Sequence, residues 1–476
     1  MNYTTLIGLE IHCELSTKSK IFCGCKNEFG ADVNTCCCPV CLGLPGALPV
    51  LNEKVLEYAA MAGMALNCDI SRRSKMDRKN YFYPDLVKAY QISQYDIPLC
   101  TDGYIEITDE EGDKKKIRIQ RIHIEEDTGK SMHDAQGDTL LDYNRSGVPL
   151  IEIVTYPDMN SPAQAMSFLE KLKETLLFTE ISDVKMEQGS LRCDINVNVV
   201  RDDGVRTKIV EIKNLNSFKA AFKAAEYEQQ RHIELLEKGE DTKKETRRWD
   251  DVQNITISMR SKETADDYRY FPEPDVVDIV LDDEFINKVR SQLPELPDAK
   301  RARLMAEYDI PEYDAKVLTA SKEVSNYFED MLGLIDNPKL VSNWIMTELL
   351  RRVNEEEAAL SELKFEKQDF AKLLELIASG TINNNAGKKV FREMFELGKK
   401  PEDVIKEQGL VQIQDEDAIK NIVEDVLGRN PQSIEDFKNG KDKALGFLVG
   451  QVMKESKGKA NPQLANKLIM EIIQSK

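Results

Sequence analysis

The stretch LIGLEIHCEL, residues 6–15, alternates apolar and polar side chains in the manner of a half-buried β-strand. One side of the predicted strand carries Glu10, His12 and Glu14. The other side is apolar and consists of Ile7, Leu9, Ile11, Cys13 and Leu15. A strand face that only meets water favours residues such as Thr. Two carboxylates and an imidazole on one face therefore indicate a binding or catalytic role.

Three later stretches repeat this pattern: RIHIEED (121–127), LRCDINVNV (191–199) and KIVEIKN (208–214). Their polar sides hold His123 and Glu125 in the first, Arg192, Asp194, Asn196 and Asn198 in the second, and Glu211 and Lys213 in the third. The simpler interpretation is an antiparallel sheet with one face in water. However, Asp and Asn are depleted in strands. If these strands adjoin, their polar sides form one concave surface rich in oxygen ligands.

Strand and helix patterns mix in the first part of the chain, and nearly every later pattern is helical. The predicted strands are 5–15, 117–125, 191–200, 207–214 and 254–259, and the clearest helices are 53–66, 162–178 and 218–238. Pro294 and Pro297 indicate a domain junction, and Gly398 with Pro401 indicates a second break. The predicted fold class is α+β, with a sheet domain at 1–292, an all-helical domain at 293–406 and a small helical tail at 407–476.

Composition and net charge exclude some classes of function. The formal net charge is −19, with 31% charged and 41% hydrophobic residues. An acidic chain does not coat nucleic acid, because phosphate attraction needs surplus Lys and Arg, so any nucleic-acid contact must be local. No run approaches the ~18 apolar residues of a membrane helix, and the N-terminus lacks a basic start with an apolar run. We therefore expect a cytoplasmic protein.

The end of the chain is a candidate for such a local contact. Residues 431–476 carry eight lysines and five carboxylates, although the chain as a whole is acidic. In GKDKALGFLVGQVMKESKGKANPQL (440–464), lysines stand beside glycines. We expect loop edges there, at which the backbone can approach a phosphate or a flat base. The alternative is a solvated helical face with a modest excess of lysine.

Six of the ten cysteines lie between residues 23 and 41. In a cytosolic chain such clustering indicates metal binding more readily than disulfides. Two cysteine pairs that bracket a loop suit a structural zinc with four thiolates. The predicted zinc ligands are Cys23, Cys25, Cys38 and Cys41. Cys36 and Cys37 leave the choice of ligands open, and reduced thiols without a metal are the alternative.

The polar strand faces also predict a site for magnesium and a nucleotide. Mg²⁺ is held by one or two carboxylates together with substrate phosphates and water, and nearby Lys or Arg would hold the phosphates. The stretch EEDTGKS (125–131) ends like a phosphate-binding P-loop. The first glycine of that motif would fall at position 124, which is Ile. Any ATP site in this chain is therefore not a P-loop site.

Several long segments, taken together, carry a family resemblance. In chain order they include IGLEIHCEL, CLGLPGALPVLN, RKNYFYPDL, HIEEDTGKS, YNRSGVPLIEIVTYPD, EIKNLNSF, SKETADDYRYFPEPD and KALGFLVGQVMKESKGKANPQL. They resemble the B subunit of the GatCAB-type tRNA-dependent amidotransferase. The segments cover the chain end to end, and each is unusual in composition. A length of 476 residues suits the bacterial B subunit and leaves no room for the inserted domain of the archaeal relative.

The resemblance implies a fold and a reaction. The N-terminal domain would be a cradle with a curved antiparallel sheet, similar to glutamine synthetase and guanidino kinases. ATP would convert the side-chain carboxylate of misacylated Glu-tRNA(Gln) or Asp-tRNA(Asn) into an acyl phosphate, which ammonia would turn into the amide. An A subunit with glutaminase activity would supply the ammonia, a small C subunit would complete a heterotrimer, and the tail would contact tRNA.

The resemblance also implies the residues of the site. We expect Mg²⁺ to be bound by Glu10, His12 and Glu125. Arg192 joins these three as a catalytic candidate. Asp194 and Glu211 are weaker candidates for Mg²⁺ and are also expected at the cofactor site. The candidates for contacting the nucleotide, its phosphates or the acceptor are Lys79, Tyr81, Lys88 and Arg192.

Two other functions compete with this one. The first is a non-catalytic, zinc-containing adaptor that presents tRNA to another enzyme, although an adaptor would not need recurrent carboxylates on sheet faces. The second is a free-standing carboxylate–amine ligase acting on a small acid, which the helical domains argue against. The chain has four histidines and no Ser-Ser-Lys amidase signature. We therefore expect its ammonia to come from a partner.

Overall fold

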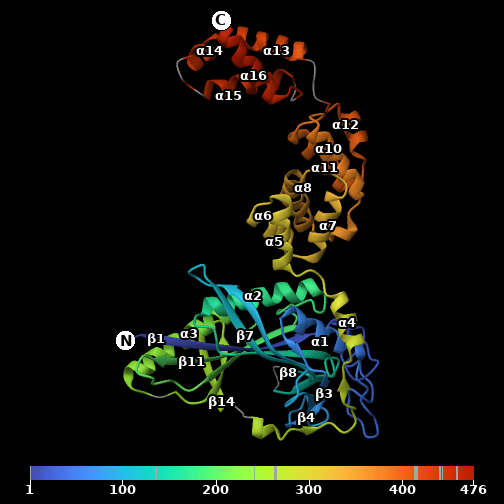
Figure 1. The fold of residues 1–476 in the computed structure, drawn as a ribbon, viewed down its shortest axis with the longest axis vertical. Helices are drawn as coiled ribbons and strands as arrows, with labels where there is room; N and C mark the ends of the chain where they lie inside the picture. Colours follow the sequence, from blue (N-terminus) through green and yellow to red (C-terminus); the bar gives the residue numbers. More distant parts are fainter. Residues whose placement is uncertain are drawn as a thin grey trace. The chain divides into compact units, whose positions relative to one another are not determined.

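The computed structural model describes residues 2–133, 137–240, 242–261, 265–411, 416–438, 441, 443–456 and 459–475. The chain divides into two compact units, Met1–Ala299 and Lys300–Lys476. The first unit combines a large sheet with helices, and the described part of the second is helical (Figure 1). The predicted mixed class, with strands first and helices after them, is confirmed at this level.

The first unit is built on a nine-stranded sheet in the order β14-β13-β12-β11-β1-β10-β7-β6-β2. Its strands are β1 (Tyr3–Glu14), β2 (Asp69–Ile70), β6 (Cys100–Thr108), β7 (Lys114–Glu126), β10 (Pro149–Thr155), β11 (Leu191–Arg201), β12 (Val210–Lys213), β13 (Glu245–Asp250) and β14 (Ile255–Ser261). The expected antiparallel arrangement holds for every neighbouring pair except β12 and β13. These two run parallel because α3, Phe218–Lys238, connects them as a crossover.

The sheet has one apolar face and one polar face. Ile7, Leu9 and Ile11 of β1 are at most 1% exposed, and they share one core with Ile195 and Ile212 of the neighbouring strands. Helices α1 (Glu53–Ala65), α2 (Pro162–Thr179) and α3 pack on this face. Figure 1 shows α2 on one side of β7 and the short strands β3 and β4 on the other. The polar side chains of the same strands therefore face away from the helices.

Capping residues explain why these helices begin and end close to the predicted positions. Ser161 accepts a hydrogen bond from the backbone N–H of Gln164, and a proline follows it in the first turn of α2. Ser217 caps α3 in the same way. Gly239 ends α3 with a φ of 71°, a conformation that favours glycine.

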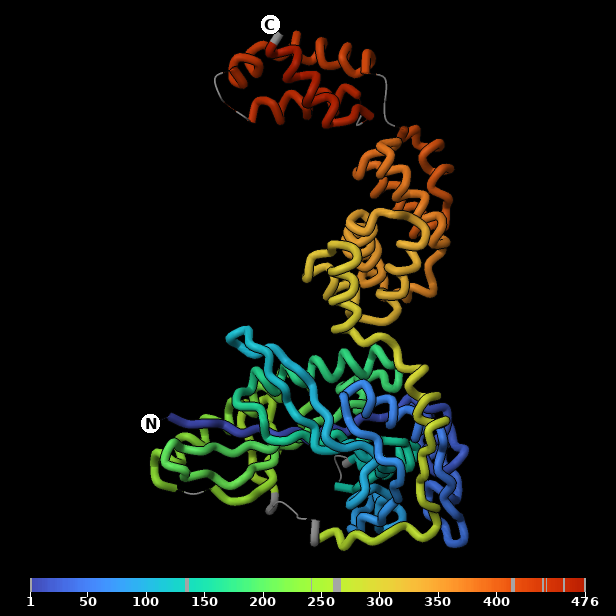
Figure 2. The backbone as a smooth tube through the Cα atoms, viewed as in Figure 1, coloured from blue at the N-terminus to red at the C-terminus, as the bar shows by residue number. Residues whose placement is uncertain are grey.

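Short strands complete the described part of the first unit. They form three small sheets: β15 (Phe271–Pro272) with β4 (Asp77–Asn80) and β5 (Tyr90–Ser93), β16 (Ile279–Val280) with β3 (Arg73–Ser74), and β8 (Lys130–His133) with β9 (Thr139–Asp142). The helical elements η1 (Ala265–Tyr268) and α4 (Asp283–Gln292) flank β15 and β16 in the chain. The β15–β4 pairing brings the chain near residue 270 against the chain near residue 80, as Figure 2 shows in yellow-green and blue.

The second unit contains two hydrophobic cores. Its elements are α5 (Pro297–Tyr308, which begins just before the unit), α6 (Glu312–Leu318), α7 (Lys322–Leu332), α8 (Pro338–Trp344), η2 (Ile345–Leu349), α9 (Leu350–Glu355), η3 (Leu360–Glu362), α10 (Lys367–Ala378), α11 (Asn384–Leu397), α12 (Pro401–Gln408), α13 (Glu416–Arg429), α14 (Pro431–Lys438), α15 (Lys443–Glu455) and α16 (Pro462–Ser475). One core runs from Leu304 to Ile405 and the other from Ile419 to Ile473. We therefore propose that the helical domain includes α12 and that the tail begins after it.

A buried carboxylate fastens α3 to the sheet. The side chain of Glu228 is 0% exposed and lies 2.7 Å from Arg231 and 3.2 Å from Arg247 of β13. Burial by itself raises the pKa of Glu228, but His232 and Arg231 outweigh it and lower the pKa from 4.5 to about 2. The ionised carboxylate therefore stabilises the folded chain above the ordinary pKa of Glu, and this contribution is lost as pH falls towards 2.

Glu228→Gln should therefore destabilise the protein most strongly near neutral pH. The difference between the two pKa values corresponds to about 3 kcal/mol at pH 7, and about 2 kcal/mol of it should be gone at pH 3. Denaturant unfolding followed by the fluorescence of Trp249 measures this, in a Trp344→Phe background that removes the other of the two tryptophans. A stability difference that does not change between pH 7 and pH 3 would contradict the prediction.

Candidate functional site

The polar face of the sheet carries its charged side chains in rows across the strands. In one row, His12 of β1 lies opposite Glu152 of β10 on one side and Arg192 of β11 on the other. Glu152 in turn lies opposite His123 of β7. The next row runs through Asp194, Glu10, Val154 and Arg121. Residues far apart in the sequence thus share one surface.

These rows form part of the lining of a cavity of about 540 Å³. Its polar and aromatic lining consists of Glu10, His12, Lys79, Tyr81, Gln91, Tyr95, Arg121, His123, Glu125, Asp127, Thr128, Glu152, Arg192, Asp194, Glu211, Lys213, Tyr268 and Tyr270. Eight of the nine residues predicted for magnesium, nucleotide or acceptor contact are in this set. The ninth, Lys88, lies elsewhere.

Three of the lining residues are close enough together to hold one metal ion. Nε2 of His12 lies 3.3 Å from a carboxylate oxygen of Glu125 and 3.6 Å from one of Glu152. One possible ligand atom from each residue lies within 4.8 Å of those of the other two. His123 adds a second imidazole, with its Nε2 3.1 Å from Glu152.

The charges of this group stabilise one another. Burial disfavours charge on His12, but Glu152 and Glu125 outweigh it and raise the pKa of His12. Burial also disfavours the carboxylates, yet Lys79 and the histidines hold the pKa of Glu125 well below its ordinary value. His123 and His12 lower the pKa of Glu152 in the same way. Both carboxylates are therefore ionised at neutral pH, which is the state that binds a metal. The proton that they favour on His12 would have to leave before its imidazole could bind one.

The three residues that could hold a metal ion are His12, Glu125 and Glu152, whereas the sequence had suggested Glu10 in place of Glu152. Glu10 lines the same cavity two residues away from His12 along β1, and its carboxylate accepts a hydrogen bond at 2.8 Å from the amide of Asn196. Alternation along one strand puts Glu10 and His12 on the same face. It does not tell which of them meets a carboxylate from another strand.

Asp194 and Glu211 form a second acidic region of the cavity, on β11 and β12. Lys213 makes an ion pair with Asp194 and lies 3.6 Å from Glu211. The hydroxyl of Thr246 donates a hydrogen bond to Glu211 at 2.7 Å. Burial raises the pKa of Asp194, and Lys213 opposes that effect. One lysine thus pairs with both carboxylates and offsets one of their two negative charges.

Lysine and arginine bring positive charge to the cavity. Nζ of Lys79 lies 5.0 Å from the ring centre of Tyr268, and that ring meets Tyr81 edge-on at 5.8 Å. Burial disfavours the Lys79 ammonium, but Glu125, Tyr270 and Glu152 together outweigh it and raise the pKa of Lys79. Arg192 makes an ion pair with Asp127. The cavity therefore offers cations to phosphate or carboxylate oxygens beside its own carboxylates.

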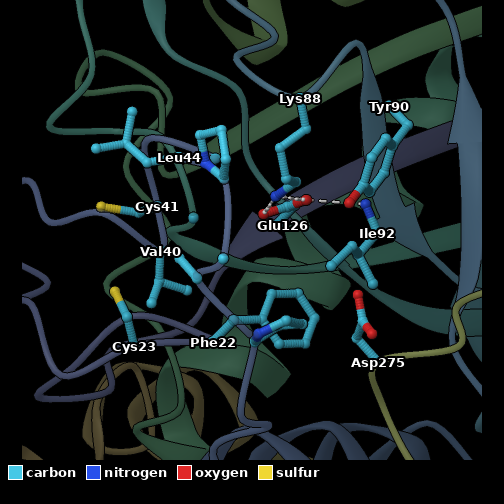
Figure 3. Close-up of a pocket in the computed structure, with 16 residues that line it drawn as sticks. Phe22, Cys23, Val40, Cys41, Leu44, Lys88, Tyr90, Ile92, Glu126 and Asp275 are labelled. Carbon is cyan, nitrogen blue, oxygen red and sulfur yellow. Dashed lines mark hydrogen bonds and ion pairs between the residues drawn. The ribbon is translucent and has the colours of Figure 1, made fainter.

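Lys88 belongs to a different pocket. Its ammonium lies 2.6 Å from Glu126, in a pocket of about 240 Å³ that Cys23, Cys41 and Tyr90 also line (Figure 3). Successive residues of β7 point to opposite faces, so Glu126 points away from the cavity that contains Glu125. The structure therefore separates Lys88 from the other candidates for nucleotide or acceptor contact.

The structure brings together the thiols of Cys23, Cys25, Cys38 and Cys41. Their Sγ atoms all lie within 4.8 Å of one another, and those of Cys38 and Cys41 are 3.9 Å apart. The other two cysteines of the loop face Asn144: the amide of Cys36 donates to its Oδ1 at 2.8 Å, and Sγ of Cys37 lies 3.8 Å from that oxygen. Four thiols at these separations could bind one metal ion.

A buried lysine supports the thiol group. Lys20 is 0% exposed, its Nζ donates to the carbonyl of Cys36 at 2.8 Å, and it lies 3.7 Å from Sγ of Cys41. Hydrogen bonds from Cys23 and from the backbone N–H of Cys38, together with the Lys20 charge, lower the pKa of Cys41 to about 4. These surroundings therefore favour the thiolate of Cys41, the form that binds metal.

Comparisons with known proteins agree along the whole chain. The model of the family described as "GatB/GatE catalytic domain" matches residues 5–287, and that of the family described as "GatB domain" matches residues 326–473. The B subunit of the aspartyl/glutamyl-tRNA(Asn/Gln) amidotransferase of Clostridium tetani is 56% identical over 472 residues, that of Caldicellulosiruptor bescii 56% over 479, and that of a Thermoanaerobacter species 56% over 473. Each alignment covers 99% of both chains. The chain belongs to the family of amidotransferase B subunits.

As a member of that family, this amidotransferase subunit is part of a ligase-type enzyme. The cavity of about 540 Å³ that contains Glu125 and Glu152 is called the carboxylate cavity below. The match over residues 5–287 includes every residue that lines it. The match over residues 326–473 falls in the helical unit. Among the residues described, no helix is both long and apolar enough to cross a membrane.

Several residues that line the carboxylate cavity were not predicted from the sequence. Glu152 is the one charged residue in the apolar run PLIEIVT, and a single charge in such a run could have indicated a functional residue. Asp127 lies just beyond β7. Tyr95 and Tyr270 enter the cavity from connecting segments that show no periodic pattern. Only their position in the fold reveals them.

Proposed function

We propose that this subunit uses ATP to activate the side-chain carboxylate of an aminoacyl-tRNA for attack by ammonia. The names of its relatives point to Asp-tRNA(Asn) and Glu-tRNA(Gln) as substrates. The observation that carries the proposal is the placement of Glu125, Glu152 and His12 beside Lys79 and Arg192 in one cavity. Such a set offers ligands to a cation and charged donors to phosphates. We also propose that the N-terminal domain is a cradle similar in fold to glutamine synthetase and guanidino kinases.

The proposed reaction has two steps. A carboxylate oxygen of the aminoacyl group attacks the γ-phosphorus of ATP, the bond to ADP breaks, and an acyl phosphate forms. Ammonia then attacks the acyl carbon, phosphate leaves with the electron pair of the C–O bond, and the nitrogen loses a proton to give the amide. Activation is needed because ammonia cannot displace oxide or hydroxide from a carboxylate.

The residues of the chain act mainly by position and charge. Phosphoryl transfer depends on aligning the reactants and neutralising charge rather than on covalent help from the protein. Lys79 and Arg192 would bind and orient phosphate or carboxylate oxygens. Arg121 offers a further donor, because its buried Nε has no hydrogen-bond partner among the described residues.

The residues that would hold Mg²⁺ are His12, Glu125 and Glu152. Two ionised carboxylates match what Mg²⁺ prefers, while the imidazole also suits Mn²⁺ and other transition metals. A cation bound there would neutralise charge on the phosphates during transfer. Titrating both metals into the ATP-dependent reaction would identify the one that the group accepts.

We also propose a structural zinc at the four clustered thiols. Four sulfur ligands within 4.8 Å of one another fit a tetrahedral ion. The group lies outside the carboxylate cavity, since Cys23 and Cys41 line the separate pocket that contains Lys88. The zinc would therefore stabilise the loop from residue 23 to residue 41 and take no part in the reaction.

The double substitution Cys38→Ser, Cys41→Ser is expected to release about one zinc ion per chain, the content of a four-thiolate site. It should also lower the thermal stability of the protein, because zinc binding contributes to folding. Metal analysis of protein purified under reducing, chelator-free conditions measures the content. The control, Cys36→Ser with Cys37→Ser, should keep the zinc. Wild-type protein without zinc would refute the site.

The proposal requires partners. An A subunit with glutaminase activity would supply ammonia, a C subunit would complete the heterotrimer, and the helical tail would contact tRNA. Because aminoacyl-tRNA is used in translation, we place this activity in the cytoplasm.

Reconstitution tests the proposal directly. The chain is combined with its A and C subunits, Mg²⁺, ATP, glutamine and misacylated tRNA. We expect amide to form on the tRNA only when ATP and glutamine are both present, with one ADP released per amide. Amide formation without ATP would overturn the proposal. A chain that binds tRNA but no ATP would favour the adaptor function instead.

A further inference from the structure

Four tyrosines form an aromatic wall of the carboxylate cavity, to which the proposed chemistry assigns no role. Tyr95 and Tyr270 are stacked, with ring centres 4.3 Å apart and planes at 7°. Tyr268 meets Tyr270 edge-on at 6.1 Å, and Tyr81 meets Tyr268 edge-on at 5.8 Å. All four line the cavity that contains the metal-binding group. They provide a flat apolar surface among charged side chains.

A buried ion pair holds one side of the aromatic wall in place. Arg78 of β4 donates two hydrogen bonds to Glu273, at 2.6 and 2.8 Å, and Glu273 is 3% exposed. The amide of Asn80 donates to the carbonyl of Arg269 at 2.8 Å, where the backbone has a φ of 48°. A buried ion pair adds little stability but can fix geometry, and a positive φ in a non-glycine residue is strained. Both features fix the backbone on either side of Tyr270.

The other half of the stack is held from β4 as well. The backbone N–H of Tyr95 donates to the carboxylate of Asp77 at 3.0 Å, and Asp77 is 2% exposed. Tyr95 itself is 42% exposed although its ring is stacked on Tyr270. Two aromatic rings fixed in a stack and open to a cavity can be extended by a further flat ring.

We propose that the Tyr95–Tyr270 pair seats the adenine of an adenosine, whose sugar–phosphate chain runs towards Lys79 and Arg121. Nζ of Lys79 lies over the ring of Tyr268, so this lysine joins the aromatic wall to the carboxylates. The buried Nε of Arg121 has no hydrogen-bond partner among the described residues, and a phosphate oxygen would satisfy it. This inference rests on the proposed function and assigns a binding role to residues that it left unused.

Two substrates of the proposed reaction contain adenosine. One is ATP, and the other is the 3′-terminal nucleoside of tRNA, to which the amino acid is esterified. Both present the same base followed by phosphate groups. The aromatic stack recognises the chemistry that they share, so separate kinetic measurements are needed to tell which of them it binds.

The test compares substitutions that remove the ring with substitutions that keep it, in the reconstituted heterotrimer. Tyr95→Leu and Tyr270→Leu should each raise the KM of one substrate by about 5- to 100-fold, as expected for a lost base stack, with a smaller change in kcat. Tyr95→Phe and Tyr270→Phe should keep the wild-type KM values. The control is Tyr104→Leu, which removes a half-buried tyrosine that Lys116 covers at 4.3 Å outside the cavity.

Each result has a defined meaning. A higher KM for ATP at saturating tRNA assigns the stack to the nucleotide, and a higher KM for tRNA at saturating ATP assigns it to the terminal adenosine. Unchanged KM values in folded Leu variants overturn the inference, and so do Phe variants as defective as the Leu variants. If Tyr270→Leu does not fold, the half-exposed Tyr95 still decides the question. A wild-type complex that forms no amide contradicts the proposed function instead.

Discussion

Glu125→Gln is expected to reduce ATP-dependent amide formation by about 100- to 1,000-fold, the usual cost of removing a preorganised charged group. The substitution keeps the shape of the side chain and removes its charge. The carboxylate is 1% exposed, lies 3.3 Å from His12 and interacts with the ammonium of Lys79. The variant therefore loses one ligand of the proposed metal-binding group and the negative charge that interacts with Lys79 and His12. The rate of amide formation in the reconstituted heterotrimer measures the effect.

Two controls separate this effect from damage to the fold. Glutamine hydrolysis by the same complex should remain largely intact, because the proposal assigns the glutaminase to another subunit. Glu106→Gln is the matched substitution, since Glu106 lies on β6 of the same sheet and pairs with Lys114 at 2.8 Å outside the cavity. It should leave amide formation unchanged. Full amide formation by the Glu125 variant would refute its assignment.

Removal of the tail is expected to raise the KM for misacylated tRNA by about 10- to 100-fold and to make it less sensitive to salt, because phosphate contacts are lost. A cut at residue 407 would remove the end of α12 and Leu410, which packs on the preceding core. Deleting residues 412–476 keeps both. ATP binding and glutamine hydrolysis without tRNA should barely change. A normal KM across a salt series would show that the tail is only structural.

A point substitution tests the same surface without a deletion. The glycines that stand beside lysines, Gly440 and Gly458, lie outside the described residues. Gly446 and Gly450 lie inside α15, with no atom within 4 Å of a Cβ added at either position. Glycine in a helix interior costs about 1 kcal/mol relative to alanine, and no packing requires it here. Gly446→Gln should therefore stabilise the helix and still weaken tRNA binding. The control is Gly428→Gln in α13, at an equally open position.

The sequence by itself predicted what depends on local periodicity. Alternation in residues 6–15 identified β1 and its polar face, because side chains alternate along any strand. Helical periodicity at 162–178 and 218–238 identified α2 and α3. Serine caps start both helices at these positions, because backbone groups at helix ends need partners close in sequence. The spacing of four cysteines identified a thiol group for the same reason, since the members of each pair lie within three positions of one another in the chain.

Only the tertiary structure decided which polar residues meet. Glu152 joins His12 because β10 pairs with β1, and that register depends on hydrogen bonds between strands about 140 residues apart in the chain. Lys88 lies outside the cavity because it pairs with Glu126. Glu126 follows Glu125 directly in β7, so its side chain points to the opposite face of the sheet. Tyr95 and Tyr270 stack because β15 returns to β4. Pairing between distant segments is set by the packing of the whole core, which no local pattern encodes.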